Sequence, residues 1–357
     1  MSIDLSRQNE WHRFNLKQYP RGKDFPGTIT NSCNHPRYAL SIDSNGDCFI
    51  CVCEAWVPIP VGNILDFNSL EEVWLSPIAQ EIQKDVDDKK FTYCAVSHCG
   101  VADTNKLLTT YYITVSMDVS CNLACPSCRS KIRNITEGPE FDHSKKLIDH
   151  FVTLIQKFDH PTQLVMTGNG DVLASVLYRP LVLNWQPLPN HKIILRTNGL
   201  LMKKLLPDSP VLPYISEFQI SMDAGTAEVY ENVRRPGKHK VLIENLDWLL
   251  EYRNTQTPRP EYVFDMFSFV LQAANAADIV NFVNLCKKYN AIPVISKLDN
   301  WGAQVLSVFN TMELTKSHPL FKTAMDQLIE AKTIDPRLRI GSLIEQQLEE
   351  YIQTLKQ

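Results

Sequence analysis

The sequence has no apolar run long enough to span a bilayer. Its N-terminal segment, MSIDLSRQNEWHRFNLKQYPRG, is polar and lacks the apolar centre of a secretory signal peptide. It also lacks a charge excess: 36 Lys and Arg residues stand against 40 Asp and Glu residues, for a net charge of −4. Such a balance gives no electrostatic footprint for nucleic acid. We therefore expect a cytoplasmic protein that binds neither membrane nor nucleic acid.

Low-complexity stretches and strictly periodic repeats are missing as well, so a globular fold is expected. With 357 residues, 44% of them hydrophobic, the chain can build one large domain or two moderate ones. From about residue 109, strand-like runs alternate with helical patterns, which predicts a parallel sheet with crossover helices. Six such runs favour an α/β fold with an open, partial (β/α)6 TIM-type barrel: 111–117, 163–168, 192–197, 217–223, 264–271 and 291–298.

The residues before this region show a different pattern of short strands and turns. SNGD at 44–47 predicts a β-hairpin over 38–53. Ser69 and Glu72 form a capping-box pattern that predicts a helix over about 70–86. We expect three parts: a small α+β cysteine-rich domain over 1–108, the partial barrel over 109–305 and a helical extension over 306–357.

The ten cysteines are unevenly distributed along the chain. Six lie from Cys33 to Cys99, three from Cys121 to Cys128, and Cys286 stands alone. Thiols stay reduced in the cytosol, so clustered cysteines there indicate metal binding before disulfides. Cys286 falls on a helical apolar stripe, where a buried core thiol is favoured over a hydrogen-atom donor.

The loop MDVSCNLACPSCRS directly follows the first strand of the βα region. It places Cys121, Cys125 and Cys128 in a Cys-x3-Cys-x2-Cys spacing. Three thiolates can hold three corners of a [4Fe–4S] cluster and leave one iron open. A structural zinc ion would need a fourth ligand, for which His143 or an N-terminal cysteine is available.

This loop and the strand ends that follow it resemble the radical S-adenosylmethionine (SAM) superfamily. TGNGD (167–171) resembles the segment that contacts the SAM amino group, although Asp171 replaces the common Glu and Asn169 interrupts the glycine pair. RTNGL (196–200) and ISMDAG (220–225) follow at the next two strand ends. The resemblance implies SAM binding by these residues: Gly168, Asn169, Gly170, Asp171, Asn198, Ser221, Asp223, Arg234 and Gln272.

The N-terminal cysteines resemble the auxiliary-cluster modules of the SPASM/twitch type. The resemblance implies a second [4Fe–4S] cluster, although in most relatives this module follows the barrel. Its ligands would be Cys33, Cys51, Cys94 and Cys99. Spacing leaves open whether Cys48 or Cys53 replaces Cys51, and structural zinc on the same thiolates is the alternative.

The resemblance implies an enzyme that cleaves SAM to a 5′-deoxyadenosyl radical and abstracts hydrogen from a substrate carbon, in oxidoreductase or isomerase chemistry. A flavodoxin- or ferredoxin-type protein would supply the electron. Relatives often modify ribosomally made peptides, and others act on sugars or small metabolites; no catalytic side chain is identified. No leader-binding domain is expected before Cys33. Two other classes remain, a zinc-binding interaction protein and an iron–sulfur electron carrier.

Overall fold

The architecture comes from a computed structural model, which describes residues 21–166, 169–256, 264–300 and 306–356. Its centre is a series of six parallel strands that pair in chain order. They are β4 (Tyr111–Val115), β5 (Thr162–Met166), β6 (His191–Thr197), β7 (Ile215–Ser221), β8 (Phe264–Leu271) and β9 (Ile292–Lys297). Each of the six runs expected as strands contains a strand within the described residues, and residues 167–168 of the second run lie outside them. The predicted open partial barrel is confirmed.

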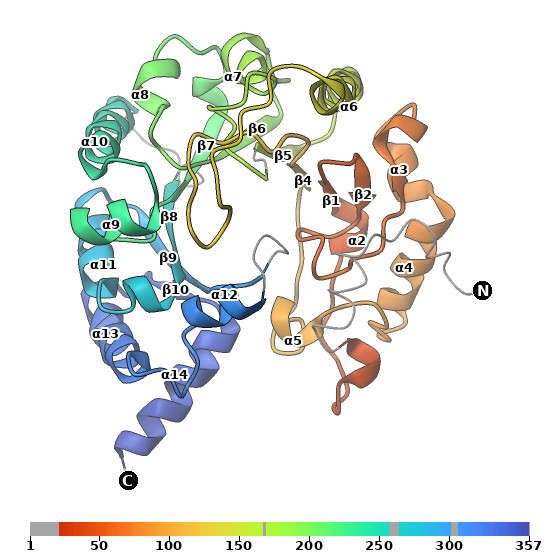
Figure 1. Cartoon of the computed structure of the whole chain (residues 1–357). Coiled ribbons are helices and arrows are strands. Elements are labelled where there is room, and N and C mark those ends of the chain that lie inside the picture. Colours follow the sequence, from red (N-terminus) through yellow and green to blue (C-terminus); the bar gives the residue numbers. More distant parts are fainter. Residues whose placement is uncertain (1–20, 167–168, 257–263, 301–305, 357) are drawn as a thin grey trace.

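Helices connect the parallel strands and lie outside the arc that the strands form (Figure 1). The burial pattern of β8 explains this arrangement: Asp265, Phe267 and Phe269 are buried, while the residues between them are partly exposed. One face of the sheet therefore packs on helices and the other faces the open barrel interior. The helices are α6 (Pro139–Ile155), α7 (Arg179–Asn184), α8 (Met202–Leu205), α9 (Ala227–Val233), α10 (His239–Thr255) and α11 (Ile279–Lys288).

The N-terminal residues join the same sheet rather than standing apart from it. β1 (Ala39–Ile42) and β2 (Asp47–Phe49) form the predicted antiparallel hairpin, and β3 (Gly62–Asn63) extends it. β1 also pairs in parallel with β4, matching Ala39 with Tyr112 and Ile42 with Val115. One ten-stranded sheet thus runs through both parts, an arrangement that the sequence did not predict.

The predicted helix over 70–86 is broken in two. The structure has α3 (Glu71–Leu75) and α4 (Pro77–Asp87), separated by Ser76 in an extended conformation. Pro77 causes the break, because a residue before proline avoids the helical region whereas proline suits the first helical position. Ser76 then caps the new helix, since its Oγ accepts a bond from Ala79 N at 3.4 Å.

The C-terminal residues are mainly helical, as expected. They form α12 (Leu306–Met312), α13 (Phe321–Ile334) and α14 (Ser342–Leu355), with a short strand β10 (Arg339–Ile340) that pairs with β9. Within the described ranges, none of the helices has the length and apolar character that crossing a membrane requires. The remaining short elements are α2 (His35–Tyr38), α5 (Val96–Cys99) and the 3-10 turns Gly22–Asp24, Ile64–Asp66, Leu212–Tyr214 and Ala273–Asn275.

Candidate metal and cofactor site

The three-cysteine loop leaves the carboxyl end of β4, where the ends of the neighbouring parallel strands meet. Cys125 is buried, Cys121 is half-buried and Cys128 is exposed. Burial raises the pKa of Cys121 to about 11 and also raises that of Cys125, where the charge of Arg234 opposes the effect. All three are free thiols, so the donor set suits a thiolate-ligated cluster.

Each of the three sulfur atoms also receives an N–H group from the chain. Leu123 N donates to Cys121 Sγ at 3.4 Å, and Arg129 Nε donates to Cys128 Sγ at 3.5 Å. Arg234 Nη1 lies 3.8 Å from Cys125 Sγ. Hydrogen bonds to cluster sulfurs stabilise their negative charge and tune the reduction potential, so this environment fits an iron–sulfur cluster.

The segment after β5 is held directly against this loop. A Cβ atom on Gly170 would lie 2.0 Å from Ser120 O, so only glycine permits the approach. The next amide, Asp171 N, donates to the same carbonyl oxygen at 2.8 Å. Asn169 O accepts a bond from Arg129. Thr167 and Gly168 lie outside the described residues.

The carboxylate of Asp171 connects two strand ends. Oδ2 accepts from Asn198 N at 2.7 Å and from Thr197 Oγ1 at 2.8 Å, while Oδ1 accepts from Leu173 N and Ala174 N. Burial raises the pKa of Asp171, and these hydrogen bonds lower it. Both oxygens are used within the chain, so Asp171 positions the loops, and its contact with SAM remains a prediction. Asn198 Nδ2 in turn donates to Asn122 Oδ1 of the cysteine loop at 2.8 Å.

Asp223 and Arg234 form a buried ion pair beside Cys125. Arg234 Nη2 lies 2.8 Å from Asp223 Oδ2, and the two side chains are 13% and 4% exposed. Asp223 Oδ1 also accepts from Val270 N at 2.7 Å. Burial raises the pKa of Asp223, whereas the guanidinium group of Arg234 lowers it. The pair brings the ends of β7 and β8 to the cysteine loop.

Three buried polar atoms near this pair have no hydrogen-bond partner among the described residues: Arg234 Nε, Gln272 Nε2 and Tyr230 Oη. Unpaired buried donors are costly, so such atoms indicate a polar group that completes them. Two of the three residues, Arg234 and Gln272, are predicted SAM contacts. Ser221 lies on the partly exposed face of β7, where its Oγ is 3.5 Å from Ser268 Oγ. The structure thus fits a polar cofactor at this position.

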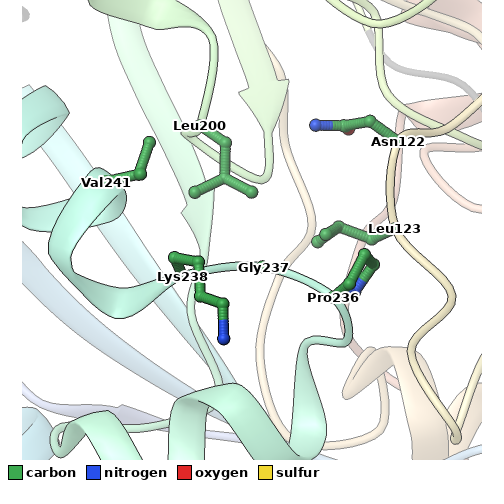
Figure 2. A pocket seen from close by; sticks show the side chains of 7 residues that line it. All are labelled: Asn122, Leu123, Leu200, Pro236, Gly237, Lys238 and Val241. Carbon is green, nitrogen blue, oxygen red and sulfur yellow. The ribbon is translucent and has the colours of Figure 1, made fainter.

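A small hollow lies beside the cysteine loop (Figure 2). Asn122 and Leu123 face Leu200 across it, with Pro236 next to Leu123 and Lys238 at the edge. Its volume of about 180 Å³ is below the range typical of small-molecule pockets. The hollow therefore marks where the loop packs against the segment that follows Arg234.

The N-terminal thiols form a second group. Burial raises the pKa of Cys94 well above its ordinary value, and the neighbouring thiols of Cys51, Cys99 and Cys33 raise it further. The pKa of Cys51 is likewise raised, mainly by burial and further by the neighbouring thiols of Cys99, Cys33 and Cys53. The four cysteines predicted as ligands are therefore near one another, although their ligand role remains a prediction.

Cys48 is placed differently from these four, whereas Cys53 lies beside Cys51. Cys48 lies on β2, and its thiol is directed to Gly46 O at 3.8 Å. The pKa of Cys53 is raised to about 12 by burial, with further effects from Glu54 and, in the opposite direction, Arg196. These positions favour Cys51 over Cys48, while Cys53 remains adjacent to the group.

Within the part of the chain that the structure describes, no group of three or more His, Cys, Asp or Glu side chains is arranged to hold a single metal ion. The thiolates of a four-iron cluster stand farther apart than the ligands of a single ion, because each thiolate binds a different iron. Cys286 is fully buried on α11, in agreement with its prediction as a core thiol.

Two residues that hold parts of the site in place were not expected from the sequence: Arg129 in the cysteine loop and Asn275 after β8. Arg129 donates to Val119 O at 2.8 Å as well as to Asn169 O and Cys128 Sγ. Asn275 Nδ2 donates to Asp223 O and Val270 O, both at 2.9 Å. The position of Arg129 directly after the third cysteine was the available signal, whereas nothing local indicated Asn275.

Comparison with known proteins identifies the N-terminal part. Residues 33–100 match the family model SPASM, described as an iron–sulfur cluster-binding domain. The match begins at Cys33 and includes all six N-terminal cysteines, so the predicted auxiliary-cluster module is confirmed. The family model covers less than half of the chain, and no curated protein matches the chain.

The solved structures that match part of this chain include SuiB of Streptococcus suis. The complex of SuiB with S-adenosylmethionine has 14% identity, a TM-score of 0.40, and coverage of 77% of this chain and 57% of that one. The complex of SuiB with precursor peptide SuiA has 11% identity and a TM-score of 0.39, and the match covers 85% of this chain and 71% of the SuiB chain. The chain thus spans little more than half the length of the SAM-bound SuiB chain.

Proposed function

We propose that the chain is a radical SAM enzyme with one SAM-binding [4Fe–4S] cluster and one auxiliary cluster. The observation that carries this proposal is the convergence of three strand ends on the three-cysteine loop. Gly170 and Asp171 after β5, Asn198 after β6 and the Asp223–Arg234 pair after β7 all reach it. The SPASM match supports the auxiliary cluster independently.

In this assignment, Cys121, Cys125 and Cys128 hold the first cluster, and Cys33, Cys51, Cys94 and Cys99 hold the second. Together with bound SAM, the first cluster would supply one-electron reductive cleavage of SAM to methionine and a 5′-deoxyadenosyl radical that abstracts hydrogen from a substrate carbon. An iron without a protein thiolate leaves a coordination position for the cofactor. The electron comes from a flavodoxin- or ferredoxin-type protein.

The chain's own residues orient and neutralise the cofactor. Arg234 is buried and fixed by Asp223, so its unpaired Nε is a preorganised donor for an anionic group such as a carboxylate. Gln272 Nε2 is a second unpaired buried donor. Asp171 keeps the β5 and β6 ends in place through four accepted hydrogen bonds. The inward face of the barrel then holds the substrate.

We further propose a peptide substrate, because relatives with SPASM modules often modify ribosomally made peptides, in oxidoreductase or isomerase chemistry. A sugar or other small metabolite is the alternative. Mass spectrometry of candidate substrates after anaerobic turnover tests this choice. A product mass change on a peptide supports the proposal, and a change confined to small metabolites contradicts it.

The decisive experiment measures iron, sulfide and 5′-deoxyadenosine after anaerobic reconstitution with SAM and dithionite. Wild type is expected to bind about eight irons and to form the nucleoside. The Cys121/Cys125/Cys128→Ala variant should retain about four irons and form none. Cys286→Ala, which changes a buried thiol on α11, is the matched control and should form the nucleoside. Zinc without nucleoside in wild type would overturn the proposal.

A further inference from the structure

A charged cluster lies on the inward face of the barrel, apart from the cofactor site. It consists of Arg196 on β6, Glu217 and Gln219 on β7, and Arg339 on β10, and is here called the lumenal cluster. Register places Arg196 beside Gln219 and Gln219 beside Met266 on β8. The opposite face of β7 carries Phe218, which is buried and lies 4.9 Å from the guanidinium carbon of Arg253 on α10. The cluster therefore faces the interior and not the helices.

Three members of the lumenal cluster, Arg196, Gln219 and Glu217, are linked by hydrogen bonds. Arg196 Nε donates to Gln219 Oε1 at 2.7 Å, and Gln219 Nε2 donates to Glu217 Oε1 at 2.5 Å. The pKa of the buried Glu217 is raised by burial and lowered by Gln219 and by the charges of Arg196 and Arg339. These hydrogen bonds fix the orientation of the Arg196 side chain, because the Gln219 amide that accepts from Arg196 is itself held by Glu217.

The guanidinium groups of the cluster have unused hydrogen-bonding capacity. Arg196 is exposed, and its two terminal nitrogens have no hydrogen-bond partner within the described ranges. Arg339 is also exposed, and its Nη1 contacts only the sulfur of Met266, a weak acceptor, at 3.4 Å. Two guanidinium groups against one carboxylate leave the cluster with a net positive charge. A planar guanidinium with free terminal nitrogens matches a carboxylate in two-point geometry.

The position of Arg196 relates the cluster to the cofactor site. Arg196 stands two residues before Asn198, whose side chain bonds to Asn122 of the cysteine loop at 2.8 Å. A molecule held by Arg196 would thus lie close to the cysteine loop.

We propose that Arg196, oriented by Gln219 and Glu217 and assisted by Arg339, binds a carboxylate group of the substrate inside the barrel. The proposal rests on the proposed function in that it calls the bound molecule the substrate. It deepens that function by naming the chemical class, a carboxylate-bearing molecule, which includes peptides with acidic side chains and peptides with a free C-terminus.

The test is binding of three short peptides to anaerobically reconstituted protein, measured by saturation-transfer NMR at millimolar peptide. The probes are Ac-Ala-Glu-Ala-NH2, its uncharged counterpart Ac-Ala-Gln-Ala-NH2, and Ac-Ala-Gln-Ala-OH, in which the terminal carboxylate is the only charge. We expect the wild type to bind at least one carboxylate peptide and not the uncharged one. The peptide that binds identifies the source of the carboxylate.

Variants assign the binding to the cluster. Arg196→Gln should weaken carboxylate binding about tenfold or more, and Arg196→Lys should weaken it less because the charge remains. Arg37→Gln, at an exposed arginine paired with Asp87, is the matched control and should bind as wild type does. Far-ultraviolet circular dichroism checks the fold, and Arg339→Gln, with a several-fold loss expected, replaces Arg196→Gln if that variant does not fold.

Binding of the uncharged Gln peptide as tight as that of the carboxylate peptides, unchanged carboxylate binding by Arg196→Gln, or no carboxylate binding by the wild type would each overturn the proposal. Nucleoside formation by the same wild-type preparation is measured separately. Its absence would contradict radical SAM chemistry, while the peptide results would still decide whether the lumenal cluster binds carboxylates.

Discussion

At the scale of single residues, we expect the buried Asp223–Arg234 pair to be sensitive to substitution. Asp223→Asn removes one charge of a buried pair and leaves the guanidinium group uncompensated. We expect it to lower the free energy of unfolding by about 3 kcal/mol, measured by urea denaturation. The control is Glu231→Gln, which breaks the exposed pair with Lys238 and should cost less than about 1 kcal/mol. Similar losses for the two variants would contradict this prediction.

Asp43 gives a pH-dependent prediction. Burial raises its pKa to about 6, with a further contribution from the charge of Asp47. Because the folded pKa exceeds the unfolded one, the carboxylate destabilises the fold increasingly as pH rises from about 4 to 6, and fully above pH 7. Asp43→Asn keeps an oxygen acceptor for Asn45 N and Asp47 N. It should therefore stabilise the protein by about 1–2 kcal/mol at pH 8 and less at pH 5.

Denaturant midpoints at the two pH values measure the effect of Asp43→Asn. Asp88→Asn, at an exposed aspartate, serves as the control and should show no such dependence. A stabilisation by Asp43→Asn that is larger at pH 5 than at pH 8 would contradict the assigned direction of the pKa shift.

The residue scale also shows what spacing could and could not determine. The spacing of Cys121, Cys125 and Cys128 within one loop was enough to predict them together as ligands, a role that stays a prediction. The choice among Cys48, Cys51 and Cys53 did not follow from spacing, because β2 ends at Phe49 and the two later cysteines lie in the turn beyond it. Strand alternation therefore gave no information there.

At the scale of elements, the loop after β5 depends on one close backbone approach. Gly170→Ala would place a Cβ atom against Ser120 O, so the two loops must separate. We expect the free energy of unfolding to fall by about 1–3 kcal/mol. The iron content should fall as well, because Cys121 directly follows Ser120 and would move with it. Gly341→Ala, where the nearest atoms lie 3.7 Å from the added carbon, should change neither. Unchanged iron content in Gly170→Ala would show that the loop does not require this contact.

The six parallel strands were predictable because each is a short apolar run bounded by turn residues. The break at Ser76 was overlooked because the apolar stripe continues across Pro77, although proline itself was a sufficient local signal. The pairing of β1 with β4 could not be predicted, since it joins segments about seventy residues apart and no local pattern specifies it.

At the scale of the whole molecule, this pairing makes the SPASM module and the barrel parts of one sheet. A module that shares backbone hydrogen bonds and a continuous core with the barrel should not unfold separately. Leu40 on β1 is fully buried and pairs with Ile113 on β4. It therefore provides a way to destabilise the module side of the junction without touching the barrel sequence.

Leu40→Ala should lower the free energy of unfolding by about 2–5 kcal/mol, because it leaves a cavity at the junction. If the molecule is one cooperative unit, hydrogen exchange at β6 should accelerate by the same factor as exchange at β1, although β6 lies two strands beyond β4. Val308→Ala, at a partly exposed position on α12, is the control and should leave both rates unchanged. Acceleration confined to the N-terminal module would show two independent units, and the shared sheet would then be an interface that opens without unfolding the barrel.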